Sequence, residues 1–431
     1  MKLPRKGLAH RSGQMFFRFF TFLFTAGSLL LVTMNGKAGD WPQFRGPDRD
    51  GISKETGLLR KWPEGGPKVL WTTEVGQGYS AAAIVDGLVY FNDYDVEKRE
   101  WLVRCLTLND GKDVWRFSEA RRIRPNHAIT RTVPAVDGKH VFSLDPKAVF
   151  HCLDAKTGKE VWRKELVKEY KTKIPPWYNG QCPLMEDDRL IIATGGDALL
   201  MALEKTTGKE IWRSQNPENQ PMTHASPMPA QLGGVKQYLY TTLKGVYGFS
   251  AKDGKLLWHA PFKLNVAVAP SPIAVDDELV FLTSGYNAGS AMFRITGSGD
   301  NFRAEKVFEL SPNEWNSEVH TPILFENHLF AVGKKSRGLF TCLNQDGEMV
   351  WTSKGKASFG LGSFLLADGM FFFLEGKTGL LRLVEANTTE YRELASAQIL
   401  SGHDVWAPLA LSDGKLVIRD LGKMVCLNVA Q

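Results

Sequence analysis

The sequence predicts an all-β fold, an eight-bladed β-propeller whose four-stranded antiparallel blades form a closed ring. Three observations predict it. A turn-plus-aromatic phrase repeats along the chain, a second landmark repeats in step with it, and complementary strands lie at the two ends of the array. Long helical periodicity is absent throughout, so the repeating unit is built from strands alone.

The first landmark is a hairpin turn followed by an aromatic residue. Asp-Gly and Thr-Gly pairs allow the positive φ of a tight turn, and β-branched or aromatic residues then resume a strand. The clearest copies are "NDGKDVW", "KTGKEVW", "TTGKEIW", "KDGKLLW" and "QDGEMVW", which end at Trp115, Trp162, Trp212, Trp258 and Trp351. Weaker copies end at Phe308 and Tyr391, and Trp71 has the aromatic ring without the hairpin. The intervals of 40–50 residues are typical of propeller blades.

The second landmark is a short strand opened by a small residue or proline. It occurs eight times, as "AAAIVDG", "TVPAVDG", "QCPLMED", "ASPMPAQ", "PSPIAVD", "HTPILFE", "GSFLLADG" and "WAPLALSDG". The last unit, Trp406 to Asn428, supplies three strands and then ends, whereas the segment around Trp71 supplies a fourth strand with no first three. Pairing an N-terminal strand at Lys68–Val75 with the C-terminal blade removes both exposed edges, so we expect the ring to close there.

The first 38 residues have the layout of a secretory signal peptide. Basic residues precede an apolar run from Phe19 to Val32, and small residues follow at Gly36–Ala38. An uncleaved membrane anchor is the alternative, but the run is shorter than the roughly 20 residues that a spanning helix needs. The six basic side chains of this segment account for the formal charge of +6. We therefore expect an exported protein of the bacterial periplasm or cell envelope, with no transmembrane segment after cleavage and no affinity for nucleic acid.

Residues 39–66 are predicted to form an N-terminal latch, followed by the propeller at 67–431. The stretch "DWPQFRGPDRDG", Asp40–Gly51, is stiff and aromatic. We expect Trp41 and Phe44 to cover apolar surface on one face of the ring and Arg45 to pair with a carboxylate or with backbone carbonyls. A flexible leader is the alternative. The "DRDGIS" part predicts a turn, because it lacks the distal glutamate of a calcium-binding loop.

Four of the five cysteines share one position in the repeat. Cys105, Cys152, Cys342 and Cys426 each precede a leucine in the third strand of a unit, and Ala202 and Gly248 occupy the matching places. A small, buried, apolar site fits all these residues. We therefore expect structural thiols rather than disulfides or metal ligands, and inter-blade packing for the repeated tryptophans.

The loops that enter the first strand of each unit are rich in polar and aromatic residues. Such loops converge at one mouth of a propeller channel, where distant residues meet. The candidate ligand-binding residues are His127, Arg131, Trp177, Asn179, His224, Asn265, His320, His403 and Trp406. They could bind a small planar or polar ligand, or they could only hydrogen-bond the backbone at the blade tops. No His-x-His pattern fixes a metal geometry, so no metal site is expected.

A basic cluster, "ARRIRPNHAITR", lies between the first and second units. Arg121, Arg122 and Arg124 are its candidate partner-binding residues, for an anionic ligand or a protein. A solvated loop is the alternative. The partner itself, protein or small ligand, is not identified by the sequence.

The phrases "LDAKTGKEVW" and "LEKTTGKEIW" resemble the pyrroloquinoline-quinone-type propeller repeat, shared by quinoprotein alcohol dehydrogenases and the outer-membrane-protein assembly factor propeller. The stretches "DWPQFRGPDRDG", "HASPMPAQLGGVKQYLY" and "SGYNAGSAMFRI" are similar to a group of exported bacterial quinoprotein-like propellers. The resemblance covers essentially Asp40 to Gln431 and implies the fold more strongly than an activity, because most such repeats belong to proteins without established catalysis.

The resemblance also allows a test for catalysis. The dehydrogenases hold the quinone and calcium in the channel with a Glu, an Asn and an Asp, often under a vicinal Cys-Cys pair, and some carry a CxxCH haem site. Neither cysteine motif occurs here, and Asn179 is the one ligand that context matches. We therefore expect no cofactor and a non-catalytic binding or assembly scaffold. A quinone- and calcium-dependent alcohol dehydrogenase is the alternative.

Overall fold

The computed structural model describes residues 39–124, 127–333 and 338–431, and the predicted signal peptide lies outside them. Strands dominate the described residues, and the single helix among them is α1 (Leu166–Tyr170). No helix in this part of the chain has the length and apolar character needed to cross a bilayer. The all-β prediction is confirmed.

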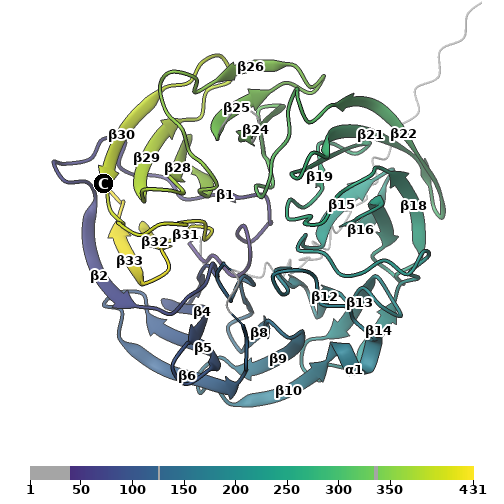
Figure 1. Cartoon of the computed structure of the whole chain (residues 1–431), viewed down its shortest axis with the longest axis horizontal. Coiled ribbons are helices and arrows are strands. Elements are labelled where there is room, and N and C mark those ends of the chain that lie inside the picture. The colour runs from purple at the N-terminus through teal and green to yellow at the C-terminus, as the bar shows by residue number, and fades with distance from the viewer. Residues whose placement is uncertain (1–38, 125–126, 334–337) are drawn as a thin grey trace, which may run out of the picture. The chain divides into compact units, whose positions relative to one another are not determined.

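Eight antiparallel sheets follow one another around a ring (Figure 1). Blade 1 contains β3 (Ala83–Val85), β4 (Leu88–Asp95), β5 (Glu100–Thr107) and β6 (Asp113–Ala120). Blade 2 contains β7 (Ala135–Val136), β8 (His140–Leu144), β9 (Val149–Asp154) and β10 (Glu160–Glu165). Blade 3 contains β11 (Leu184–Glu186), β12 (Arg189–Ala193), β13 (Leu200–Glu204) and β14 (Glu210–Arg213). Blade 4 contains β15 (Met228–Leu232), β16 (Val235–Thr242), β17 (Gly245–Ser250) and β18 (Leu256–Pro261).

The second half of the ring repeats this pattern. Blade 5 contains β19 (Ile273–Ala274), β20 (Leu279–Ser284), β21 (Gly289–Ser298) and β22 (Asn301–Leu310). Blade 6 contains β23 (Ile323–Phe325), β24 (His328–Gly333), β25 (Leu339–Leu343) and β26 (Met349–Thr352). Blade 7 contains β27 (Phe364–Ala367), β28 (Met370–Leu374), β29 (Leu380–Glu385) and β30 (Glu393–Gln398). Blade 8 contains β31 (Ala410–Ser412), β32 (Lys415–Arg419), β33 (Lys423–Asn428) and β2 (Lys68–Glu74).

The ring closes where the sequence predicts. Strand β2 pairs antiparallel with β33, so that Trp71 lies opposite Cys426. The same register places Cys105 opposite Trp115, and the third strand of blade 4 places Gly248 opposite Trp258. The third-strand position is therefore small because an aromatic ring of the outer strand lies against it. All five cysteines are buried and free.

In most blades the aromatic ring of the outer strand also packs against the next blade. In five places a turn glycine of the next blade lies so close to the ring that an added Cβ would clash; at Gly158 this Cβ would be 2.4 Å from the Trp115 ring. The pairs are Gly111 on Trp71, Gly158 on Trp115, Gly208 on Trp162, Gly254 on Trp212 and Gly347 on Phe308. Several indole N–H groups donate to a carbonyl of that next blade, as Trp115 does to Ala155 (2.9 Å). The prediction of inter-blade packing is confirmed.

Blade 7 corrects one detail of the predicted repeat. Ala395, not Tyr391, occupies the position of the repeated aromatic residue, because Leu383 pairs with Ala395. Tyr391 instead packs against Trp351 of blade 6, with ring centroids 6.0 Å apart. The physical reason is the closure: β33 and β2 come from opposite ends of the chain, so blade 8 has no hairpin glycine to receive a ring from blade 7.

The segment before β2 bonds to blades on several sides of the ring. Trp41 is 2% exposed and exchanges two backbone hydrogen bonds with Ile84 of blade 1. Further along, Arg49 donates to the carbonyl of Pro183, which precedes blade 3. Strand β1 (Ile52–Ser53) then adds a parallel fifth strand to β27 of blade 7, a pairing that the sequence did not predict.

Candidate functional site

A cavity of about 430 Å³ is built by the connections between blades. Each of the eight connections between consecutive blades contributes at least one side chain to its lining. The aromatic, charged and imidazole-bearing residues of the lining are Phe44, Arg45, Tyr79, His127, Arg131, Trp177, His224, Tyr286, Glu318, His320, Phe364 and Trp406. We call this space the channel-mouth cavity.

Six of the nine candidate ligand-binding residues line this cavity: His127, Arg131, Trp177, His224, His320 and Trp406. The other three lie outside its lining. Asn179 is buried, accepts a hydrogen bond from Thr132 Oγ1 (3.2 Å) and donates to the carbonyl of Asp145. Asn265 donates to the carbonyl of Tyr286 (2.7 Å), and His403 is exposed beside Asp404. These three side chains therefore support loops or face solvent.

Two stacked aromatic pairs contribute to the walls. Tyr79 and Trp406 have ring centroids 5.1 Å apart with planes inclined by 22°. Trp177 and Tyr286 are 6.3 Å apart and inclined by 26°. These offset-stacked arrangements hold flat apolar faces in fixed orientations. The cavity can therefore accept a planar group by stacking.

The charged lining residues carry more positive than negative charge. Arg131 lies over the Tyr79 ring (5.7 Å), and burial lowers its pKa to about 10, still well above neutrality. Arg45 donates to four backbone carbonyls, including those of Thr321 and Pro322 (both 2.8 Å). Its pKa is also lowered to about 10 by burial. Glu318 is the one carboxylate in the lining.

The imidazoles of His224 and His320 are neutral at physiological pH. Burial lowers the pKa of His224 to about 4, and the charge of Arg131 adds to this effect. Burial likewise lowers the pKa of His320 to about 4, with a smaller contribution from Arg45. His320 Nε2 lies 2.6 Å from the carbonyl of Gly362, which fixes the proton of the neutral ring on that nitrogen.

Four bulky residues of the cavity lining have strained backbone. His127, Trp177, Tyr286 and Arg45 all have φ between 53° and 65°, in the left-handed region. Bulky residues rarely adopt it, at a cost of about 1–3 kcal/mol each, and such strain gathers at functional sites. The fold therefore holds four of the lining side chains against a local backbone preference.

The lining offers no evident nucleophile. Burial raises the pKa of the Cys182 thiol, which keeps it protonated. The hydroxyl of Ser226 accepts from the backbone N–H of Cys182, and that of Ser363 donates to the carbonyl of Trp406. These contacts favour binding over acyl transfer.

The donor set also fits calcium poorly. Calcium takes six to eight oxygen ligands, with carboxylates prominent among them. The cavity lining contains one carboxylate, Glu318, together with the guanidinium groups of Arg45 and Arg131. Asn179, the ligand suggested by the resemblance, is engaged elsewhere. The residues present therefore do not match the calcium-and-quinone group of the dehydrogenases.

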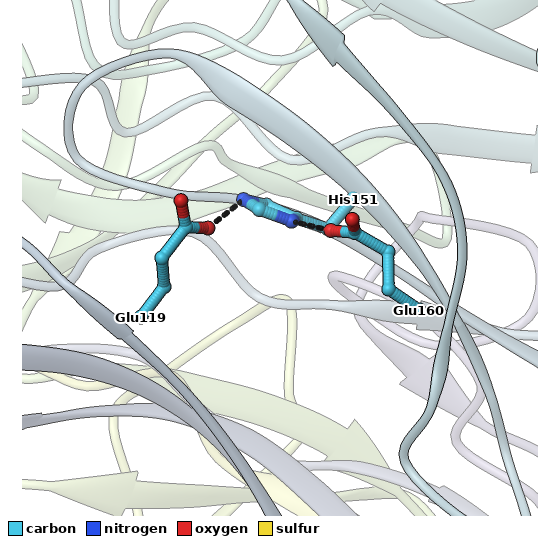
Figure 2. Close-up of side chains that lie close together, drawn as sticks. All are labelled: Glu119, His151 and Glu160. Atoms are coloured by element: carbon cyan, nitrogen blue, oxygen red, sulfur yellow. Dashed lines mark hydrogen bonds and ion pairs between the residues drawn. The ribbon is translucent and has the colours of Figure 1, made fainter.

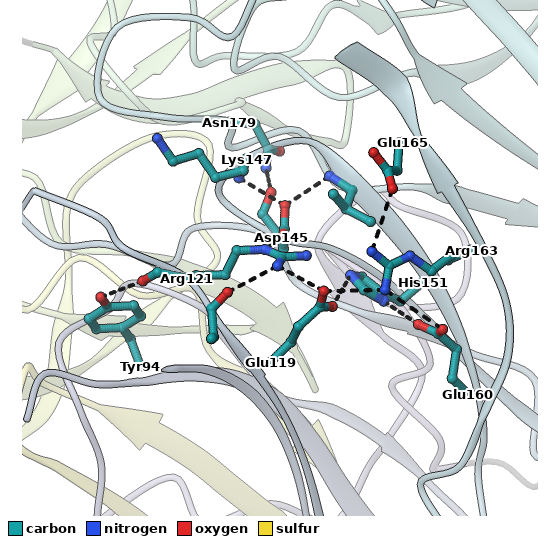
Figure 3. A network of polar contacts seen from close by, with 12 residues as sticks. Tyr94, Glu119, Arg121, Asp145, Lys147, His151, Glu160, Arg163, Glu165 and Asn179 are labelled. Atoms are coloured by element: carbon teal, nitrogen blue, oxygen red, sulfur yellow. Dashed lines mark hydrogen bonds and ion pairs between the residues drawn. The ribbon is translucent and has the colours of Figure 1, made fainter. Parts of the chain in front are cut away.

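A second polar cluster joins blades 1 and 2: Glu119 lies on β6, His151 on β9 and Glu160 on β10 (Figure 2). His151 is fully buried, with Nδ1 2.7 Å from Glu160 Oε2 and Nε2 3.7 Å from Glu119 Oε2. One ligand atom from each of the three residues lies within 4.8 Å of the others, a spacing that could hold a metal ion. However, Arg121 and Arg163 both contact Glu119 Oε1, at 2.8 and 3.2 Å (Figure 3). Guanidinium groups therefore already supply the positive charge.

The candidate partner-binding arginines fall into two kinds. Arg121 is 14% exposed and pairs with Asp145, whose side chain is fully buried, as well as with Glu119 (Figure 3). Arg122 and Arg124 are exposed. Arg121 is therefore a structural ion-pair residue, whereas Arg122 and Arg124 are available to a partner.

Sequence reasoning missed several residues of the cavity. Tyr79 lies in the connection before blade 1 and could have been found by the rule used for the other entry loops. Tyr286 lies in the hairpin between β20 and β21, where no entry-loop rule applies. Phe44 was expected on a face of the ring rather than in a cavity wall. Arg45 was expected to pair with a carboxylate or with backbone carbonyls, and its hydrogen bonds to carbonyls confirm this, but its place in the cavity wall was not foreseen.

The repeated strand register, the tryptophan contacts and the channel-mouth cavity define a propeller of the pyrroloquinoline-quinone-repeat class. A family model described as outer membrane protein assembly factor BamB matches residues 98–352. The chain belongs to this family.

Individual relatives are more distant. Outer membrane protein assembly factor BamB of Escherichia coli (strain K12) is 30% identical over 112 residues, which are 24% of this chain and 27% of that protein. Quinohemoprotein alcohol dehydrogenase from Comamonas testosteroni is similar in structure at 14% identity, with a TM-score of 0.51, covering 92% of this chain and 82% of that one. Saccharomyces cerevisiae Sqt1 gives a TM-score of 0.55 at 10% identity, covering 85% of this chain and 100% of that one. The structural likenesses show the fold alone.

Proposed function

We propose that this protein is an exported, non-catalytic propeller of the periplasm or cell envelope that binds a ligand or protein partner at the channel-mouth cavity. The observation that carries the proposal is one cavity to which all eight connections contribute and whose lining includes aromatic, cationic and neutral imidazole side chains. Strained backbone at four of those residues supports a role beyond folding. Membership of a family described by outer membrane protein assembly supports a scaffold in the envelope.

The first experiment separates binding from catalysis. Purified protein is supplied with pyrroloquinoline quinone and calcium, and dye-linked oxidation of primary alcohols is measured. We expect no turnover above the protein-free control, because the cavity provides one carboxylate and no free amide ligand. Sustained turnover that a chelator abolishes would refute the non-catalytic proposal and establish a dehydrogenase.

The second experiment tests the cavity. Tagged protein and a Trp177→Ala/Trp406→Ala variant are used to retain partners and small molecules from an envelope extract, with identification by mass spectrometry. We expect the variant to lose what the unmodified protein retains, because it lacks one ring of each stacked pair. Val114→Ala, at an exposed position of β6, is the control. Equal retention by both variants would show that the cavity is not the binding site.

A further inference from the structure

We propose that blades 1–3 dock on an anionic phospholipid surface through the face of the ring that carries the connections between blades. The residues that carry the proposal are Arg122, Arg124, Lys147 and Lys173, and we call them the cationic sector. None of them lines the channel-mouth cavity. The inference therefore goes beyond the proposed function and does not depend on it.

The two connections that flank blade 2 are strongly basic. Residues 121–134 and 171–183 contain six basic side chains and no acidic one. Lys147 belongs to the turn between β8 and β9, which lies on the same face because successive strands of an antiparallel blade run in opposite directions. This part of the face therefore has a positive potential that attracts anions.

The four side chains of the cationic sector are available to an external anion. All four are exposed, and among the described residues none of them has a carboxylate within 4.0 Å. Their neighbours are engaged within the protein instead. Arg121 pairs with the buried Asp145, and Lys171 Nζ lies 3.1 Å from Asp197 Oδ1. The acidic groups of this region are thus already neutralised, and the charge of the sector is not.

Local packing holds the sector together. Ile123 is 8% exposed between the exposed Arg122 and Arg124, so the two arginine side chains lie away from the packed side of their segment. The Tyr178 hydroxyl donates to the carbonyl of Arg124 (2.8 Å), and Lys147 Nζ lies 5.4 Å from the centroid of the Tyr178 ring. These contacts join both connections and the β8–β9 turn in one continuous surface.

The composition of this surface favours a bilayer over a protein or an acidic peptide. Lysine and arginine bind the phosphates of lipid headgroups through charge and hydrogen bonds. A stable protein interface also needs a desolvated apolar centre, and no large hydrophobic side chain is exposed among the described residues of the two connections. The half-buried Tyr178 ring beside Lys147 is typical of residues at a membrane–water interface.

The opposite face of the ring carries acidic hairpins. The turns between the first and second strands of the blades lie there. In blade 3, the side chains of Asp187 and Asp188 are 78% and 76% exposed. In blade 5, Asp276, Asp277 and Glu278 are all exposed. An anionic bilayer attracts the cationic sector and repels these hairpins, so it orients the ring with the sector toward the lipid.

Co-sedimentation of the unmodified full chain with vesicles tests the docking. Vesicles of phosphatidylcholine alone are compared with vesicles of equal parts phosphatidylcholine and phosphatidylglycerol. The salt concentration is raised from 0.1 M to 1 M, which shortens the Debye length from about 10 Å to about 3 Å. We expect at least tenfold tighter binding to the anionic vesicles in low salt and loss of this preference in high salt. Equal binding to both vesicles, or a preference that salt does not reduce, would overturn the proposal.

Two variants with the same change in charge locate the contact. Arg122→Gln/Arg124→Gln alters the sector, whereas Lys156→Gln/Lys159→Gln alters exposed positions in the β9–β10 turn on the opposite face. We expect the first variant to bind anionic vesicles about tenfold more weakly and the second to change less than twofold. Both keep residues 1–38, so the basic charges of that segment contribute equally. Equal losses in the two variants would mean that only net charge matters and would overturn the proposal.

Lysine acetylation, measured by mass spectrometry, identifies the face that meets the lipid. Anionic vesicles should protect Lys147 and Lys173 and leave Lys156 and Lys159 reactive. Uniform protection, or protection of the opposite face, would contradict the proposed orientation. Polyglutamate is the competing probe: if it protects the two sector lysines and the vesicles do not, the sector binds acidic protein segments and the lipid proposal is wrong.

The cavity variant separates this proposal from the proposed function. Trp177→Ala/Trp406→Ala should bind anionic vesicles within twofold of the unmodified protein, because neither residue belongs to the cationic sector. Loss of vesicle binding in this variant would overturn the sector as an independent site. Loss of envelope partners with vesicle binding intact supports both proposals, since each variant then affects its own surface.

Discussion

The rim and the channel mouth of this propeller are built in opposite ways. At the rim, one contact is repeated from blade to blade: a turn glycine lies under an aromatic ring of the preceding blade. At the mouth, the eight connections differ from one another, and bulky residues occupy left-handed backbone positions that glycine would adopt without strain. In the repeated rim contacts, glycine occupies the positions where φ is positive and no side chain fits. At the mouth, bulky residues occupy positions where φ is positive. We infer that the rim carries stability and the mouth carries function.

Trp41 should be the most sensitive position in the N-terminal segment. Its ring is 2% exposed and its backbone pairs with Ile84 of blade 1. Trp41→Ala should lower the free energy of unfolding by about 3–5 kcal/mol, the usual cost of removing a buried aromatic ring. Urea denaturation checks this. Deletion of residues 40–51 should lower the melting temperature as well, and an unchanged value would show that the segment is not a latch.

Gly158 tests the rim contact itself. Gly158→Ala should destabilise the protein by about 3 kcal/mol, because the new Cβ meets the Trp115 ring at 2.4 Å and φ is +70°. Gly369 is the matched control, since it has φ +69° and nothing within 4 Å of an added Cβ. Gly369→Ala should therefore cost only the backbone part, about 1–2 kcal/mol. Equal losses of unfolding free energy in the two variants would mean that the contact with the Trp115 ring does not contribute to stability.

Because His320 is buried, the free energy of unfolding should decrease as the pH becomes acidic. Its folded-state pKa of about 4 lies below the ordinary value of 6.5. The unfolded chain therefore binds a proton first, and stability is full above pH 6.5 and is lost as the pH falls toward 4, by up to about 3 kcal/mol. His320→Gln should reduce this slope, whereas His403→Gln, at an exposed position, should not. Urea unfolding at pH 7, 5.5 and 4 measures the difference. Parallel slopes in all three proteins would assign the acid sensitivity to other groups.

The sequence was sufficient for features that repeat. Blade number, the closing strand and the small third-strand residues all follow from local patterns that occur in several copies, so one copy checks another. Features that depend on a single arrangement in space were not predictable. The pairing of β1 with β27 involves two residues without a repeat signal, and Tyr286 enters the cavity from a hairpin inside a blade. In blade 7, Tyr391 was taken for the repeated aromatic residue because its side chain is aromatic. The strand register places Ala395 at that position instead.

Trp177 allows the substitution opposite to Gly158→Ala, from a bulky residue to glycine. Its φ of 62° suits glycine, so Trp177→Gly relieves backbone strain while removing a half-buried ring. We expect the two effects to offset each other, leaving the free energy of unfolding within about 1 kcal/mol of the unmodified protein. Retention of partners from the envelope extract should nevertheless fall, because the Trp177 ring is lost from the cavity lining. A loss of stability as large as that of Gly158→Ala would show that the mouth supports the fold as the rim does.

The basic cluster should show the smallest effect on stability. Arg122 and Arg124 are exposed, so the Arg122→Ser/Arg124→Ser variant should unfold within about 0.5 kcal/mol of the unmodified protein. Arg121→Ser is the contrasting variant: it leaves the buried Asp145 carboxylate without its guanidinium and should be clearly destabilised. Retention of envelope partners by the double variant then reports on surface charge alone, because the fold is intact. Unchanged retention would assign the binding of protein partners to the channel mouth.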